Sequence, residues 1–62
     1  MNISDKIKIY LKETGRTQNY LCRHTGLTPS ALSLALGGKR RIRLDEYCKI
    51  CKALVVDPDF FL

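Results

Sequence analysis

Long apolar runs are missing from this chain: no stretch of its 62 residues approaches the ~18 to 20 apolar residues that a membrane-spanning helix needs. Residues 1–5 also lack the basic start and the apolar segment that open a secretion signal. The three cysteines are an odd number, and a reducing compartment would keep them as thiols. We therefore expect a cytoplasmic protein that does not associate with a membrane.

Groups for catalysis are equally scarce. With a single histidine and no base within obvious reach of a nucleophile, the chain offers no candidate catalytic site. Cys48 and Cys51 are spaced like zinc ligands, and Cys22 with His24 could complete the set. However, the first two lie on the apolar stripe of a predicted helix, and the other two point about 200° apart on another. We predict packed thiols rather than a metal, and a protein that is not an enzyme and uses no cofactor or small-molecule substrate.

Carboxylates are absent from residues 14–44. This window holds six cations, whereas the rest of the chain has five lysines against six carboxylates, so the net charge of +5 is concentrated in the window. A basic field confined to one stretch favours polyanions and steers their approach. The alternative is a solvated basic face, which small soluble domains often have. The six cations are Arg16, Arg23, Lys39, Arg40, Arg41 and Arg43.

Apolar residues recur at spacings of three and four, and no alternating strand pattern, internal repeat or linker interrupts them. We expect an all-α fold, a compact four- to five-helix bundle in a single domain of residues 1–62. The predicted helices cover residues 3–13 (capped by Asn2 or Ser4), 18–24, 28–37 and 44–54, with a last turn over 59–62. The side chains predicted to face inward are Ile3, Ile7, Tyr10, Leu11, Leu21, Cys22, Leu32, Ala35, Leu36, Leu44, Tyr47, Cys48, Cys51, Leu54 and Val55.

Residues 17–40 are predicted to form two short helices joined by a glycine turn. Gly26 stands where the first helix must stop, because glycine takes a positive φ without steric cost. Thr28 can then cap a new helix, and Pro29 fits its first position, where no hydrogen-bonding N–H is needed. Two glycines at positions 37 and 38 end it. This arrangement indicates a helix-turn-helix.

The second helix of the pair has one face of short side chains. On a helical wheel, Ser30, Ser33, Leu34 and Gly37 lie opposite the inward side. Small residues would let the helix lie deep in a DNA major groove, where serines can bond base edges or phosphates and a leucine can touch a thymine methyl. We therefore interpret this helix as a recognition helix for DNA.

Residues 7–56 resemble the helix-turn-helix domain of phage repressors, Cro proteins and their bacterial relatives, the lambda repressor-like family. The resemblance runs without a gap and covers about four-fifths of the chain. It rests on Thr17-Gln18, Leu21, Gly26-Leu27-Thr28, Leu32-Ser33, Gly38-Lys39-Arg40 and Leu54-Val55-Val56.

The resemblance implies which residues contact double-stranded DNA. Gln18, at the start of the second helix, would contact the DNA backbone and orient side chains at the edge of the groove. The recognition helix, about residues 28–37, would read bases, and the loop after it would hold phosphates through backbone N–H groups and basic side chains. The base-facing residues would be Thr28, Pro29, Ser30, Ser33 and Leu34. The phosphate-facing residues would be Gly38, Lys39, Arg40 and Arg41, and the basic cluster extends to Arg43.

Some positions depart from the family pattern. Many members pair an arginine late in the first helix with a glutamate late in the third, whereas this chain has Leu11 and Leu36 there. We predict an apolar contact in place of the ion pair, which can be neutral or stabilising. Cys22 and Cys51 stand where alanine is usual, so both are predicted to be buried.

We predict a sequence-specific DNA-binding transcriptional regulator of the Cro or repressor type, acting as a homodimer on a pseudo-palindromic site. The dimer surface would come from apolar residues near the C-terminus: Ile50, Phe60, Phe61 and Leu62. The alternative is a protein-interaction module on the same fold, such as an antirepressor or antitoxin-like partner. It remains open because Pro29 and Leu34 stand where the family often has glutamine, arginine or asparagine, the stronger base readers.

Overall fold

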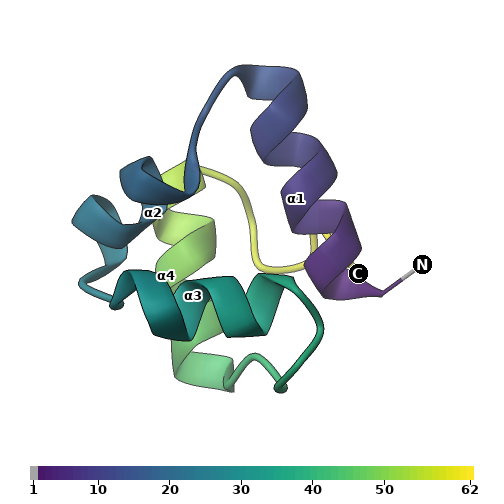
Figure 1. Ribbon diagram of the computed structural model, residues 1–62. Helices are drawn as coiled ribbons and strands as arrows, with labels where there is room; N and C mark the ends of the chain where they lie inside the picture. The colour runs from purple at the N-terminus through teal and green to yellow at the C-terminus, as the bar shows by residue number, and fades with distance from the viewer. Residues whose placement is uncertain (1) are drawn as a thin grey trace.

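The computed structural model describes residues 2–62, so Met1, the first residue of the predicted domain, lies outside the described residues. Figure 1 shows helices joined by short loops, and residues 58–61 form a final turn. Within residues 2–62 there are four helices and no strand, which confirms the predicted all-α bundle. The helices are α1 (Ile3–Thr14), α2 (Gln18–Thr25), α3 (Pro29–Leu36) and α4 (Leu44–Leu54).

Three of these helices begin at a side chain that accepts a hydrogen bond from the backbone N–H three residues later. The caps are Asn2, Thr17 and Thr28, at distances of 2.9, 3.2 and 3.1 Å. Such caps satisfy N–H groups that have no partner inside the helix. Pro29 occupies the first turn of α3, as predicted. The starts of α2 and α3 therefore follow from local sequence signals.

α1, α2 and α4 each end at a residue with left-handed backbone, and in α1 this residue is Gly15 with φ 72°. Gly26 ends α2 with φ 77°, and Gly38 makes the turn after α3 with φ 76°, while Gly37 stays right-handed. Val55 ends α4 with φ 59°, a region that glycine enters freely but that is strained for a β-branched residue. Glycine thus provides the left-handed turns on both sides of α3, whereas the end of α4 is strained.

The core lies where the helices meet. α2 contacts both α3 and α4, and α1 contacts α3. Leu11 and Leu36 are 4% and 1% exposed and belong to the same buried cluster, so apolar side chains fill both positions where relatives carry an ion pair. The full cluster is Ile7, Leu11, Leu21, Leu32, Leu36, Tyr47, Ile50, Cys51, Leu54 and Phe61.

α4 packs its predicted apolar stripe on the core, with Tyr47, Cys51 and Leu54 buried, but the prediction fails at other positions. Ile50 is fully buried and so cannot contribute to the predicted dimer surface, whereas Leu44 is 79% exposed and Val55 is 83% exposed. At about 100° per residue, Leu44 lies only about 20° from the buried Cys51 around the helix, so its exposure follows from its position as the first residue of α4. Val55 has already left the helix. The inward assignment was therefore wrong for Leu44 and Val55, and Cys48 is only half-buried.

The C-terminal turn folds back on α1 and α4. Phe61 is 3% exposed, and its ring meets those of Tyr10 and Tyr47 edge to face, with centroids 5.6 and 6.5 Å away. The prediction that Phe61 is exposed was therefore wrong, because the turn places its ring in the core. Phe60 and Leu62 remain 54% and 75% exposed.

The cysteines are free thiols. Cys51 is 1% exposed, as predicted, and burial raises the pKa of its thiol. Cys22 is half-buried rather than buried, because it lies about 100° around α2 from the fully buried Leu21. Within residues 2–62, no group of three His, Cys, Asp or Glu side chains could hold a metal ion. None of the described helices is both long enough and apolar enough to cross a membrane.

Candidate nucleic-acid interface

α3 presents the face that the helical wheel predicts. Ser30 and Ser33 are exposed, Leu34 is 47% exposed, and the opposite side of the helix faces the core. A shallow hollow of about 510 Å³ lies on this face, lined by Leu34, the two serines and Pro29. Apolar walls beside two hydroxyl groups suit a surface that touches both methyl groups and polar edges of bases.

Hydrogen bonds fix the turn before α3. The hydroxyl of Thr25, which is 8% exposed, donates to the Leu21 carbonyl at 2.6 Å and accepts from the Leu27 N–H at 3.2 Å. Because Thr25 connects the end of α2 to the residue that follows Gly26, the two helices have a defined angle. Sequence reasoning missed this role, although a threonine directly before a helix-ending glycine is a usable signal.

The other end of α3 is tied to α1. The Ser4 hydroxyl donates to the Ala35 carbonyl at 2.9 Å, across 31 residues of sequence. This carbonyl lies in the last turn of α3, where helix carbonyls lack intrahelical partners. From the sequence, Ser4 was predicted only as a possible cap of the first helix, and the observed cap is Asn2. The start of α3 is therefore capped by its own Thr28, and its end is held by Ser4 of α1.

The start of α2 is anchored to α4. Gln18 is the first residue of α2 and is exposed. Two residues on, the Tyr20 hydroxyl donates to the Ala53 carbonyl of α4 at 3.3 Å, and the Arg16 guanidinium lies 5.4 Å from the Tyr20 ring centroid. This cation–π contact occupies one cation of the basic window. Gln18 thus projects to solvent from a helix start whose neighbours are fixed.

Some backbone N–H groups in the loop after α3 donate hydrogen bonds within the protein, and others do not. Those of Gly38 and Lys39 donate to the Ala35 and Leu34 carbonyls, at 3.2 and 2.9 Å, and so complete the end of α3. Within residues 2–62, the N–H groups of Arg40, Arg41 and Ile42 donate to no protein acceptor, whereas that of Arg43 donates to Glu46. The N–H groups of Arg40, Arg41 and Ile42 are therefore free to hold a phosphate.

Arg40 is engaged inside the protein. Its guanidinium donates to both carboxylate oxygens of Glu46, at 3.0 and 2.8 Å, and to the Arg41 carbonyl at 3.1 Å. Glu46 also accepts from the Arg43 N–H at 3.0 Å, at the start of α4. The side-chain hydrogen bond from Arg40, with that of the Arg43 N–H, lowers the pKa of Glu46 from 4.5 to about 2. Glu46 therefore neutralises one cation of the loop and holds the loop against α4.

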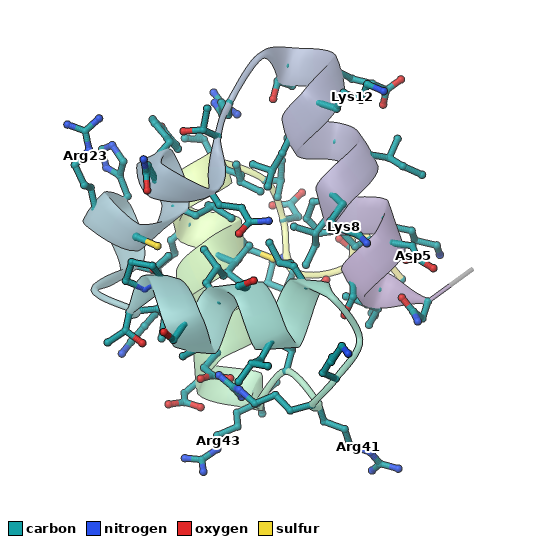
Figure 2. All side chains as sticks on the ribbon, viewed as in Figure 1. Asp5, Lys8, Lys12, Arg23, Arg41 and Arg43 are labelled. Atoms are coloured by element: carbon teal, nitrogen blue, oxygen red, sulfur yellow. The ribbon has the colours of Figure 1, made fainter. Side chains whose placement is uncertain are left out.

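The remaining cations of the loop are Lys39, Arg41 and Arg43, and all three are exposed. Figure 2 shows Arg41 and Arg43 pointing away from the body at the end where the loop meets α4, whereas Arg23 projects from α2 on another side. The six cations of the window therefore do not form one patch. The exposed cations that lie next to α3 in the chain are Lys39, Arg41 and Arg43.

These features define a helix-turn-helix domain: a pair of short helices around a glycine turn, an exposed second helix and a basic loop after it. The family model for the Cro/C1-type HTH DNA-binding domain matches residues 6–59, which is most of the chain. The chain belongs to this family of DNA-binding domains. A comparison with the curated proteins and another with the solved structures each found no match.

Proposed function

We propose that this protein is a sequence-specific transcriptional regulator of the Cro or repressor type that inserts α3 into the major groove of DNA. The observation that carries the proposal is the exposed α3 face of short side chains, held at both ends and followed directly by a basic loop. Base contacts supply specificity, while phosphate contacts fix the position of the helix on the duplex.

The proposed roles follow the exposed groups. Gln18 contacts the backbone at the edge of the groove. Arg40 contributes its free N–H to a phosphate while its side chain braces the loop, and the exposed cations contribute their charges. The residues facing bases are Thr28, Pro29, Ser30, Ser33 and Leu34. The residues at phosphates are Lys39, Arg40, Arg41 and Arg43, with Gly38 shaping the loop.

We further propose that two copies bind one pseudo-palindromic site, with half-sites about one helical turn apart. Phe60 supports this assembly, because it is a phenylalanine that is 54% exposed on a domain of 62 residues. Domains of this size bury only about 60% of their surface and gain stability from association. A protein that regulates DNA acts where the DNA is, in line with the predicted cytoplasmic location.

Selection of bound fragments from random duplex DNA tests this function, followed by affinity measurements at two salt concentrations. The proposal predicts an enriched palindrome whose complex contains two protein copies, together with affinity that falls as salt rises. Phe60→Ser should lower the fraction of dimer in sedimentation experiments and the affinity for the palindrome together, whereas Ile9→Ser, at another exposed apolar residue, should change neither. Fragments with no common sequence would contradict sequence-specific binding, and an asymmetric site with one copy bound would contradict the dimer.

A further inference from the structure

We infer that an open groove beside the basic loop docks an acidic, apolar segment of a partner protein. The groove has a volume of about 1110 Å³ and is mostly apolar. Its walls come from the first turn of α1, from residues 38–42, from the first turn of α4 and from the C-terminal turn. These segments are far apart in sequence, and the fold brings them together. The groove is separate from the α3 face that is proposed to read bases.

Two leucines in the groove are among the most exposed apolar side chains of the described chain. Leu44 is 79% exposed and Leu62 is 75% exposed, and both line the groove together with the half-buried Ile3 and Ile42. Isolated exposed leucines are ordinary on protein surfaces, but several apolar side chains gathered in one concave surface indicate an interaction site. The partner segment therefore needs apolar side chains of its own.

Charge around the groove is of one sign. Lys6, Lys39 and Arg41 line it, and none of them belongs to an ion pair within residues 2–62. Arg40 also lines it, but Glu46 neutralises its charge. No carboxylate side chain from the described residues lines the groove. Three unpaired cations around an apolar floor complement a segment in which acidic residues alternate with apolar ones.

Two other occupants fit this groove less well. The proposed dimer contact, Phe60, does not line the groove, and the net charge of +5 on a second copy opposes its approach to this cationic rim. A small ligand would be expected in a more enclosed site, because such sites bury 70–90% or more of their ligands, whereas this groove is open to solvent. An extended or helical segment of another protein can cover the open length and reach the cations on separate elements.

Docking would have a consequence for DNA binding, and this consequence rests on the proposed function. Lys39 and Arg41 belong both to the groove and to the proposed phosphate contacts. An acidic segment paired with these two cations would remove them from the DNA and add negative charge beside the duplex. Partner and DNA should therefore exclude each other, and the partner would release the regulator from its site.

The experiment selects binders of the full chain from random 12-residue peptides displayed on phage, and then measures the most enriched peptide in solution. We expect peptides rich in aspartate or glutamate alternating with leucine or phenylalanine. Leu44→Ser should weaken the enriched peptide at least about tenfold, because it removes an apolar contact in the groove. Val55→Ser is the matched control: it alters an equally exposed residue outside the groove and should change affinity less than about twofold.

Several results would overturn the inference. The selection could enrich no peptide that binds the natural chain better than it binds the Leu44→Ser variant. It could also enrich peptides that lack acidic residues. A dimer of the free protein that Leu44→Ser dissociates would assign the groove to a second copy instead. The enriched peptide is also added to the protein bound to duplex DNA. A complex that contains both peptide and duplex would overturn the expected competition. Absence of any DNA binding would contradict the proposed function and leave the peptide result intact.

Discussion

Arg40 and Glu46 form a bidentate ion pair that joins the loop after α3 to the first turn of α4. The two N···O distances are 3.0 and 2.8 Å, and the side chains are 30% and 12% exposed. Paired, charge-assisted bonds of this kind fix geometry more firmly than a single contact. The pair makes Arg40 a brace for the loop, whereas Lys39, Arg41 and Arg43 are exposed and form no ion pair within residues 2–62, so these are the charges that we propose to meet phosphates.

The salt dependence of DNA binding should separate these roles. Arg41→Ala should flatten the slope of log affinity against log salt by about 0.9, because one phosphate contact no longer releases a counterion. Arg40→Ala should lower affinity without flattening the slope, since its charge is already neutralised. Titrations at several salt concentrations measure both, with Lys12→Ala on α1 as the charge-matched control. A flattened slope for Arg40→Ala would show that its side chain does contact phosphate.

Stability should depend on pH through Glu46. The folded-state pKa of Glu46 is lowered to about 2 from its ordinary 4.5, so the ion pair stabilises the protein above pH 4.5 and this contribution is lost as the pH falls toward 2. Urea unfolding from pH 6 to pH 2 should show a smaller loss for Glu46→Gln than for the natural chain. Glu13→Gln removes a carboxylate outside any ion pair of the described residues and is the control. Equal pH profiles for Glu46→Gln and the natural chain would contradict the assignment.

The strained end of α4 predicts a stabilising substitution. Val55 has φ 59° and is 83% exposed, so Val55→Gly removes strain and sacrifices little burial. The left-handed conformation costs a residue other than glycine about 1–2 kcal/mol. Glycine avoids this strain but loses about 0.5–1 kcal/mol more chain entropy on folding. We expect a net gain of about 0.5–1 kcal/mol, seen as a rise in Tm of several degrees. Gly26→Val, the reverse exchange at a similar φ, should destabilise; a lower Tm for Val55→Gly would count against the strain.

Leu34 should read a thymine methyl group. A leucine offers no hydrogen bond, so the contact should contribute about 1 kcal/mol or less, which is at most about fivefold in Kd. In a selected site, thymines are replaced by uracil one at a time, and Kd is measured for the natural chain and for Leu34→Ala. One replacement should weaken the natural chain and leave Leu34→Ala unchanged. If no replacement separates the two proteins, Leu34 does not touch a methyl group.

Local signals explain why the recognition helix could be predicted from the sequence. The cap at Thr28, the proline after it and the glycine turn at Gly26 each act within a few residues. The wheel of α3 also predicted its exposed face, because a short helix packed on one side has a single buried arc. These features required no knowledge of the rest of the fold.

Long-range relationships explain what the sequence could not predict. Burial in α4 was misjudged at Leu44 and Ile50 because it depends on where α2 and the C-terminal turn pack. The brace between Arg40 and Glu46 crosses an irregular loop, so no helical spacing indicates it. From the sequence, the six cations of residues 14–44 were therefore predicted to form one basic field, although their positions and partners differ.

If α3 reads sequence while the loop supplies affinity, the bases that the protein selects should depend on the exposed side chains of α3. Selection from random duplex DNA is run on the natural chain and on a variant with Ser30→Ala, Ser33→Ala and Leu34→Ala, which keeps every charge and alters only exposed α3 residues. We expect an enriched palindrome for the natural chain, and salt-dependent binding without that preference for the variant. Enrichment of the same palindrome by the variant would contradict the claim that this face of α3 reads the bases.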